Sequence, residues 1–103
     1  MKAVVLNCTL KPSPHTSSTE ALAKVVIAEL EKGGAEVELI RLVDLDIKPG
    51  VSADEGDGDQ WPQVDGKLKA ADIVVFATPT WLGQMSSVCL RALERMDAWF
   101  AET

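Results

Sequence analysis

The chain has little basic charge, few cysteines and no long apolar run, and each shortage excludes a class of protein. Its 103 residues include 10 Lys and Arg against 16 Asp and Glu, a formal net charge of −6, so we expect no nucleic-acid partner, which would require cations facing phosphates. Two cysteines and one histidine are too few for a disulfide framework or a Cys/His metal site. No apolar run approaches the roughly 20 residues that span a bilayer. These absences favour a cytoplasmic protein that holds no metal and does not enter a membrane.

The remaining composition is that of a folded α/β domain. Hydrophobic residues make up 47% of the chain and charged residues 25%, which is the balance of a globular domain and not of a disordered one. Residues 3–7 and 73–77 are short aliphatic runs without polar alternation, as is typical of parallel strands that are covered on both faces. Residues 37–42 alternate more loosely with charges, which indicates an edge strand.

Three helices are expected between and after these strands. Ser17, followed three residues later by Glu20, forms a capping box that predicts the start of the first helix, and Gly33-Gly34 predicts its end. Residues 64–71 predict a short second helix and residues 86–101 a third. Apolar residues of the first helix recur at helical spacing and are expected to be buried: Leu22, Val25, Val26 and Leu30.

The order of these elements predicts an α/β fold, a three-layer doubly wound parallel sheet. In such sheets ligands bind beyond the carboxyl ends of the strands, where the strand order reverses. If the order is 2-1-3, the loops at 8–16 and 78–85 are neighbours at that edge. The long loop at 51–63 carries an acidic cluster (Asp54, Glu55, Asp57 and Asp59) without EF-hand spacing, so a solvated loop is favoured over a calcium site.

The first of these loops combines hydroxyls with a lysine at the start of a helix. A helix N-terminus presents unpaired N–H groups that suit a phosphate. Neither a Walker A motif nor a Gly-x-Gly-x-x-Gly fingerprint occurs, and the alternative is a polar loop that only caps the helix. Cys8 is interpreted as a buried thiol and His15 as a solvent-facing residue. The residues that would hold a phosphate are Thr9, Lys11, Ser17, Ser18 and Thr19.

The second loop places an indole beside a glycine. Trp81 could pack against a planar heterocycle while the backbone around Gly83 bonds its polar edge. The alternative is that Trp81 plugs the core. Next to a phosphate site, the first interpretation indicates a ligand that is aromatic at one end and phosphorylated at the other.

Residues 78–87, Thr-Pro-Thr-Trp-Leu-Gly-Gln-Met-Ser-Ser, resemble the second flavin loop of the flavodoxin-like NAD(P)H-dependent FMN reductases. Residues 9–19 are similar to the phosphate loop of that family, and the resemblance covers essentially the whole chain. It implies FMN as cofactor, NAD(P)H as co-substrate, an acceptor such as a quinone or free flavin, and a homo-oligomer, a dimer or tetramer. No acid–base residue is required, because the flavin carries the chemistry. The resemblance assigns the flavin ring to Pro79, Thr80, Trp81, Leu82, Gly83 and Gln84.

The chain also departs from this family. Flavodoxin-like relatives have five strands in the order 2-1-3-4-5 and roughly twice this length, so strands 4 and 5 are expected to be missing. Residues 1–103 would then be the N-terminal part of an FMN-binding domain, with the third strand as an open edge. In the family, the loop at 51–63 lies near the flavin or a partner subunit, where Trp61 could pack. A non-enzymatic electron carrier and a cofactor-free interaction module remain as alternatives.

Overall fold

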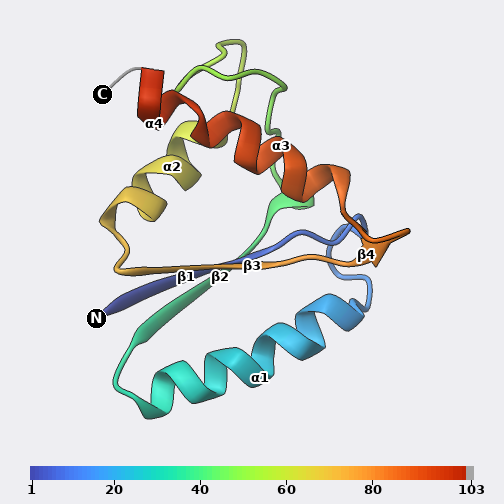
Figure 1. The fold of residues 1–103 in the computed structure, drawn as a ribbon, viewed down its shortest axis with the longest axis vertical. Helices are drawn as coiled ribbons and strands as arrows, with labels where there is room; N and C mark the ends of the chain where they lie inside the picture. Colours follow the sequence, from blue (N-terminus) through green and yellow to red (C-terminus); the bar gives the residue numbers. More distant parts are fainter. Residues whose placement is uncertain (102–103) are drawn as a thin grey trace.

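The computed structural model describes residues 1–101 and shows a three-stranded parallel sheet between layers of helices (Figure 1). The central strand β1 (Lys2–Asn7) pairs in parallel with β2 (Glu36–Arg41) on one side and with β3 (Ile73–Ala77) on the other. The sheet order is therefore β2-β1-β3. This confirms the predicted α/β, doubly wound, flavodoxin-like fold with strand order 2-1-3. Residues 102–103 of the predicted domain lie outside the described residues.

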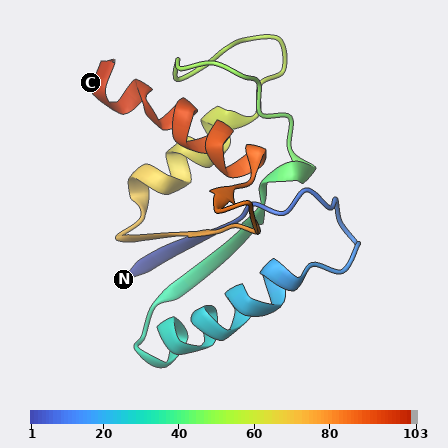
Figure 2. The ribbon, with the colours of Figure 1, turned by 45° about the vertical axis from the view of Figure 1, so that its right-hand side comes forward.

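The helices cover the two faces of the sheet unequally. Helix α1 (Ser18–Lys32) lies alone on one face, while α2 (Trp61–Ala70) and α3 (Ser87–Met96) lie on the other (Figures 1 and 2). Every residue of β1 after Lys2 is buried, as its unalternated apolar sequence predicts. The remaining elements are short: the 3₁₀ turn η1 (Leu42–Asp44), the strands β4 (Thr80–Trp81) and β5 (Gln84–Met85), and helix α4 (Ala98–Ala101).

The core lies between β1 and the layer formed by α2 and α3. Val4 and Leu6 of β1 pack there with Leu68 of α2 and Ala92 of α3. Trp61, at the start of α2, is the largest side chain in this core and is completely buried. Among the described residues, no helix is both long enough and apolar enough to cross a membrane.

The two edges of the sheet differ in chemistry. Along β2, Glu36 and Glu38 are exposed, and Glu38 forms an ion pair with Lys67 at 2.6 Å. Charged side chains of this kind oppose pairing with another strand. Strand β3 has none, all five of its residues are partly exposed, and within residues 1–101 only β1 pairs with it. The expected open edge at the third strand is therefore present.

The buried stripe predicted for the first helix is wrong in part. Leu22 is 70% exposed and Val25 62%, Val26 is also exposed, and Leu30 is half-buried. Only Ala23 of α1 is fully buried. The reason is that α1 has no neighbouring helix on its face, so only the side chains directed at the strands lose contact with water.

Several predicted boundaries also change. The helix predicted for residues 64–71 begins at Trp61, because Pro62 occupies its first turn, where proline is favourable. The helix predicted for residues 86–101 is two helices, α3 and α4, which are separated by Asp97. Phe100 is exposed, and the buried face of α3 includes Arg95.

Candidate functional site

The two predicted loops meet at the carboxyl edge of the sheet. The Cys8 amide, just after β1, donates to the Ala77 carbonyl at the end of β3 at 2.8 Å. Ser86, which follows the second loop, donates its Oγ–H to the Cys8 carbonyl at 2.7 Å. The loop after β1 and the β4–β5 segment therefore lie side by side, at the right of Figure 1. This confirms that the strand order makes the two loops neighbours.

The first loop is ordered by its own hydroxyls. Thr9 is buried, and its Oγ1 accepts the Lys11 amide at 3.3 Å. Ser17 is also buried, and its Oγ accepts the Glu20 amide at 3.0 Å, which confirms the Ser17 half of the capping box. A hydroxyl that accepts a hydrogen bond still has its own O–H to donate. Thr9 and Ser17 thus shape the loop and keep a donor each.

The remaining predicted phosphate residues lie around the start of α1. Ser18 and Thr19 are in its first turn, where backbone N–H groups have no partner within the helix. Lys11 is exposed in the loop before it. Together these residues offer donors and one positive charge. Their assignment to a phosphate stays a prediction.

Two residues that the sequence patterns did not indicate hold this loop from outside. Arg41, the last residue of β2, donates from Nη1 to the carbonyls of Lys11 at 3.1 Å and His15 at 2.8 Å. The Asp44 carboxylate accepts the Ser13 amide at 2.8 Å and the Ser13 hydroxyl at 2.5 Å. No local motif marks either residue, because both act on the backbone of a segment far away in sequence.

The second loop forms a β-hairpin. Strands β4 and β5 pair antiparallel, and the two residues between them, Leu82 (φ 52°) and Gly83 (φ 76°), both have positive φ, as in the tight turns that fit hairpins. Trp81 is 52% exposed and Leu82 is fully exposed. Trp81 therefore does not plug the core, and the alternative interpretation of this residue is wrong.

The rest of the predicted ring-binding set surrounds this tip. Pro79 precedes the hairpin and is half-buried, while Thr80 and Gln84 are exposed members of its two strands. At Gly83 an added Cβ would meet no atom within 4 Å, so the tip is open. An open surface carrying an indole fits a flat aromatic ligand. These assignments also stay predictions.

Ser86 links the segment after the second loop to the start of the first loop. The sequence patterns did not indicate this residue as part of the site. It is buried at the N-cap of α3, where its Oγ accepts the Cys89 amide at 3.1 Å and donates to the Cys8 carbonyl. Its own amide donates to Thr78 Oγ1 at 3.0 Å. A serine before an apolar helix is a recognisable capping signal, but its bond to Cys8 is not visible in sequence.

The Cys8 thiol is not placed to act as a nucleophile. Cys8 and Cys89 are both buried, and burial, with the neighbouring Cys89, raises the pKa of the Cys8 thiol. The Cys8 thiol therefore stays protonated and unreactive, in agreement with its predicted structural role. His15 is exposed, as predicted.

The acidic loop is not simply solvated, which corrects the prediction for Asp59. The Asp59 carboxylate is fully buried against Arg95 of α3, with Oδ2 at 2.5 Å from Nη2. Trp61 also lies in the core of this chain and does not face a flavin or a partner subunit. Within residues 1–101, no group of three or more His, Cys, Asp or Glu side chains could hold a metal ion.

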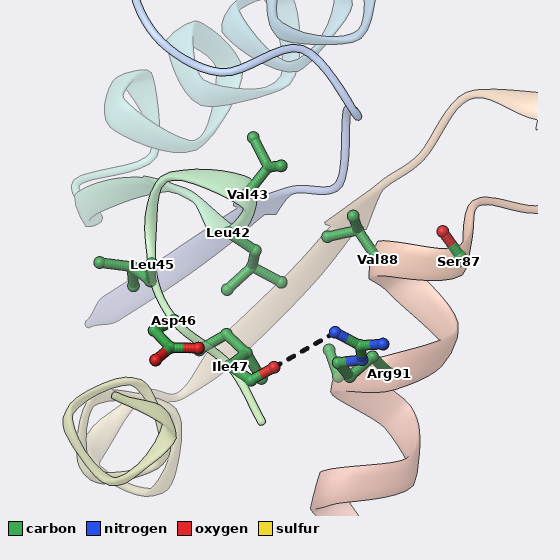
Figure 3. Close-up of a pocket in the computed structure, with 9 residues that line it drawn as sticks. Leu42, Val43, Leu45, Asp46, Ile47, Ser87, Val88 and Arg91 are labelled. Carbon is green, nitrogen blue, oxygen red and sulfur yellow. Dashed lines mark hydrogen bonds between the residues drawn. The ribbon is translucent and has the colours of Figure 1, made fainter. Parts of the chain in front are cut away.

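A separate pocket of about 220 Å³ lies between the segment after β2 and the first turns of α3 (Figure 3). Apolar side chains such as Leu42, Leu45 and Val88 line it, and Arg91 Nη1 donates across it to the Ile47 carbonyl at 3.4 Å. None of the eleven predicted flavin residues is among its lining residues. The pocket is therefore distinct from the two-loop site.

The two loops carry groups that suit the two ends of a phosphorylated aromatic molecule such as FMN. Hydroxyl and amide donors with a lysine gather at the start of α1, which suits a phosphate. The exposed Trp81 indole on an open hairpin suits the isoalloxazine ring. The two loops begin side by side at one edge of the sheet, where Ser86 bonds to the Cys8 carbonyl.

Comparison with known proteins places the chain among flavin proteins. The family described as NADPH-dependent FMN reductase matches residues 1–102. The 8-demethyl-8-aminoriboflavin-5'-phosphate synthase of Streptomyces davaonensis is 35% identical over 106 residues, covering 94% of this chain and 41% of that protein. An iron-sulfur flavoprotein of Archaeoglobus fulgidus is 32% identical over 101 residues, covering 92% of this chain and 48% of that protein.

A solved structure gives the same result for the fold. RosB with the bound intermediate OHC-RP (8-demethyl-8-formylriboflavin-5'-phosphate) matches with a TM-score of 0.85 and 35% identity, over 94% of this chain and 42% of RosB. The chain spans less than half the length of each of these matches. On the match to its sequence over residues 1–102, the chain belongs to the NADPH-dependent FMN reductase family.

Proposed function

We propose that this chain binds FMN with its two loops and serves as an oxidoreductase that takes hydride from NAD(P)H and passes electrons to a small acceptor such as a quinone or free flavin. The observation that carries the proposal is that the two loops begin side by side at one edge of the sheet, where Ser86 Oγ donates to the Cys8 carbonyl. One loop leads to the donor-rich start of α1, and the other carries the exposed indole of Trp81. The names of two similar proteins support a phosphorylated flavin as the ligand. Bound flavin supplies the hydride- and electron-transfer chemistry.

At the phosphate end, the chain contributes binding and charge. The backbone N–H groups and hydroxyls of Ser18 and Thr19 would donate to phosphate oxygens, and Lys11 would neutralise part of the negative charge. Because the whole chain is acidic, with a net charge of −6, this local group of donors has to overcome a repulsive background. The phosphate end therefore decides whether FMN or riboflavin is bound.

At the ring end, the chain contributes a flat apolar surface. Trp81 and Leu82 are exposed on the hairpin, and contact with the flavin ring would remove both from water. The Gln84 amide, on the opposite strand from Trp81, can offer a donor and an acceptor to the polar edge of the ring. These residues orient the ring and need not exchange protons with it.

A titration of FMN with the chain, with riboflavin as the phosphate-free control, tests the proposal. We expect quenching of flavin fluorescence, with FMN bound at least about tenfold more tightly than riboflavin, because charge-assisted bonds to a phosphate contribute about 1.5–3 kcal/mol each. NADH or NADPH should then bleach the absorbance of the bound flavin. Bound flavin that neither nucleotide bleaches would indicate an electron carrier, and a folded chain that binds neither flavin would refute the proposal.

We also propose that the chain forms a homo-oligomer. The exposed Leu22 and Val25 of α1 are the observation that supports self-association, since exposed apolar surfaces favour pairing. Sedimentation equilibrium should give a mass of two or four chains. A mass of one chain over the whole concentration range would contradict this proposal.

A further inference from the structure

We propose that Arg41 and Asp44, at the end of β2, hold the loop of residues 9–17 in the conformation that binds a phosphate, and thereby set the preference for FMN over riboflavin. We call this pair the Arg41–Asp44 clamp. The inference rests on the proposed function. It assigns a positioning role to two residues that do not belong to either flavin loop.

Arg41 is placed to fix the loop at two points. Its side chain is only 8% exposed, and Nη1 reaches the carbonyls of both Lys11 and His15. Its Nη2 lies 3.3 Å from the carboxylate of Glu20 in the first turn of α1. One planar guanidinium therefore links β2, the loop and the helix that follows the loop.

Asp44 fixes the middle of the same loop. Its carboxylate accepts both the amide and the hydroxyl of Ser13, which lies between the two carbonyls that Arg41 holds. These two hydrogen bonds lower the pKa of Asp44, which shows that they favour the charged form of the carboxylate. Arg41 and Asp44 thus hold the loop at three points along its backbone, residues 11, 13 and 15.

The chemistry of these contacts explains why they favour an anion. A carbonyl oxygen carries partial negative charge and would repel a phosphate if it turned toward one. Arg41 engages the oxygens of Lys11 and His15, and it also pairs with the Glu20 carboxylate near the helix start. Arg41 thereby occupies three negative groups around the loop, while Asp44 takes up the amide and hydroxyl of Ser13 alone. The Ser18 and Thr19 donors and the Lys11 ammonium are left to meet the ligand.

The loop and Arg41 also share one hollow of the surface. A pocket of about 550 Å³ is lined by residues 13–17, by Arg41 and by the start of α1. The Nε of Arg41 is buried and has no hydrogen-bond partner among the described residues. A change of loop conformation would therefore alter the surroundings of the Arg41 side chain, because both line the same pocket.

The test compares the affinities for FMN and riboflavin in three variants and one control. For Arg41→Gln we expect the Kd for FMN to rise about 10- to 100-fold, the range for losing hydrogen bonds from a charged donor, while the Kd for riboflavin changes less than about threefold. Arg41→Lys keeps the positive charge but not the planar guanidinium with its several donors, so the affinity for FMN should fall by an intermediate factor. Asp44→Asn should lower the affinity for FMN less. The control is Lys67→Gln, which breaks the exposed ion pair between Lys67 of α2 and Glu38 of β2, the strand that also carries Arg41. It should change the affinity for neither flavin.

Equal losses for the two flavins, or no loss in any clamp variant, would overturn the proposal, because either result would mean that the clamp does not act on phosphate recognition. Hydrogen–deuterium exchange of residues 9–17 in the flavin-free chain gives an independent readout. We expect faster exchange there in Arg41→Gln and Asp44→Asn than in the parent and in Lys67→Gln. If the parent binds no flavin, the proposed function fails, while exchange still tests the clamp: unchanged exchange would refute it as well.

Discussion

Replacing Arg95 by leucine is expected to destabilise the fold by about 3–5 kcal/mol, because it leaves the buried Asp59 carboxylate without its counter-charge. Both side chains are completely buried. Arg95 Nη1 donates to Asp59 Oδ1 at 3.0 Å and Nη2 donates to Oδ2 at 2.5 Å, a two-point contact. Against a total stability of about 5–15 kcal/mol for a domain, this loss is large.

The remaining donors of Arg95 fix the long loop before α2. They reach the carbonyls of Lys48 at 2.9 Å, Ser52 at 3.1 Å and Ala53 at 3.3 Å. The guanidinium also lies 5.7 Å from the ring centroid of Trp61, within the range of a cation–π contact. Arg95 therefore ties residues 48–59 to the helical layer, although this segment has no regular secondary structure.

These additional contacts predict an asymmetry between the two partners. Asp59→Asn leaves Arg95 with three carbonyl acceptors, whereas Arg95→Leu leaves Asp59 with only the backbone amides of Lys48, Glu55 and Trp61. We therefore expect Asp59→Asn to cost less than Arg95→Leu. Urea denaturation at pH 7, followed by circular dichroism, measures both free energies of unfolding.

Arg91→Leu is the matched control for this experiment. Arg91 is also on α3, but it is exposed and makes one long bond to the Ile47 carbonyl (Figure 3). We expect a loss within about 0.5 kcal/mol, as for most surface substitutions. If Arg95→Leu lay within about 1 kcal/mol of Arg91→Leu, the buried pair would not have the structural role that we assign to it.

The same pair gives the acid sensitivity of the fold a definite sign. The Arg95 guanidinium, with three backbone amides, holds the pKa of Asp59 well below its usual value of 3.8. A carboxyl group whose pKa is lowered by folding stabilises the folded state above its unfolded pKa, and this contribution is lost as the pH falls below that value. Between pH 7 and pH 3, Asp59→Asn should therefore lose less stability than the parent.

The elements that the sequence predicted correctly are those encoded by neighbouring residues. The apolar run of β1, the Ser17 cap of α1 and the apolar run of β3 are local signals, and all three appear in the structure. The two loops of the candidate site follow from them, because the carboxyl ends of β1 and β3 are adjacent once the strand order is 2-1-3.

The residues that the sequence did not reveal act across long separations. Arg95 and Asp59 are 36 residues apart, and in sequence one belongs to a predicted helix and the other to an acidic loop. Arg41 contacts backbone carbonyls, and a carbonyl is present at every position, so no side-chain pattern records the contact. Burial of a charge depends on a partner that only the fold brings near.

Replacing Ser86 by alanine is expected to cost about 2–4 kcal/mol of folding stability, through loss of a helix cap at about 1 kcal/mol and an unpaired buried carbonyl at about 1–3 kcal/mol. The Ser86 hydroxyl is the cap of α3 and also the donor to the Cys8 carbonyl at the start of the first loop. Without this hydroxyl, no side chain at this point joins the segment after the hairpin to the loop that follows β1.

Because the two loops would then be held together only through the sheet, where the Cys8 amide donates to the Ala77 carbonyl, FMN affinity should fall together with stability. We expect the Kd for FMN to rise about tenfold in Ser86→Ala, because part of the binding free energy would be used to order the two loops relative to each other. Ser86→Thr keeps the hydroxyl and should recover most of both losses. The control is Ser87→Ala, at the adjacent exposed serine. It should leave the free energies of unfolding and of FMN binding within about 0.5 kcal/mol of the parent.

Urea denaturation and the FMN titration on these three variants separate the two roles of Ser86. If Ser86→Ala lost stability but kept the parent Kd for FMN, the cap of α3 would be its only role, and the two loops would be positioned by the sheet alone. If Ser86→Ala matched Ser87→Ala in both measurements, the bond from Ser86 Oγ to the Cys8 carbonyl would contribute neither to stability nor to FMN affinity. Loss of both stability and FMN affinity, with recovery in Ser86→Thr, would show that one buried hydroxyl couples the two loops of the proposed flavin site.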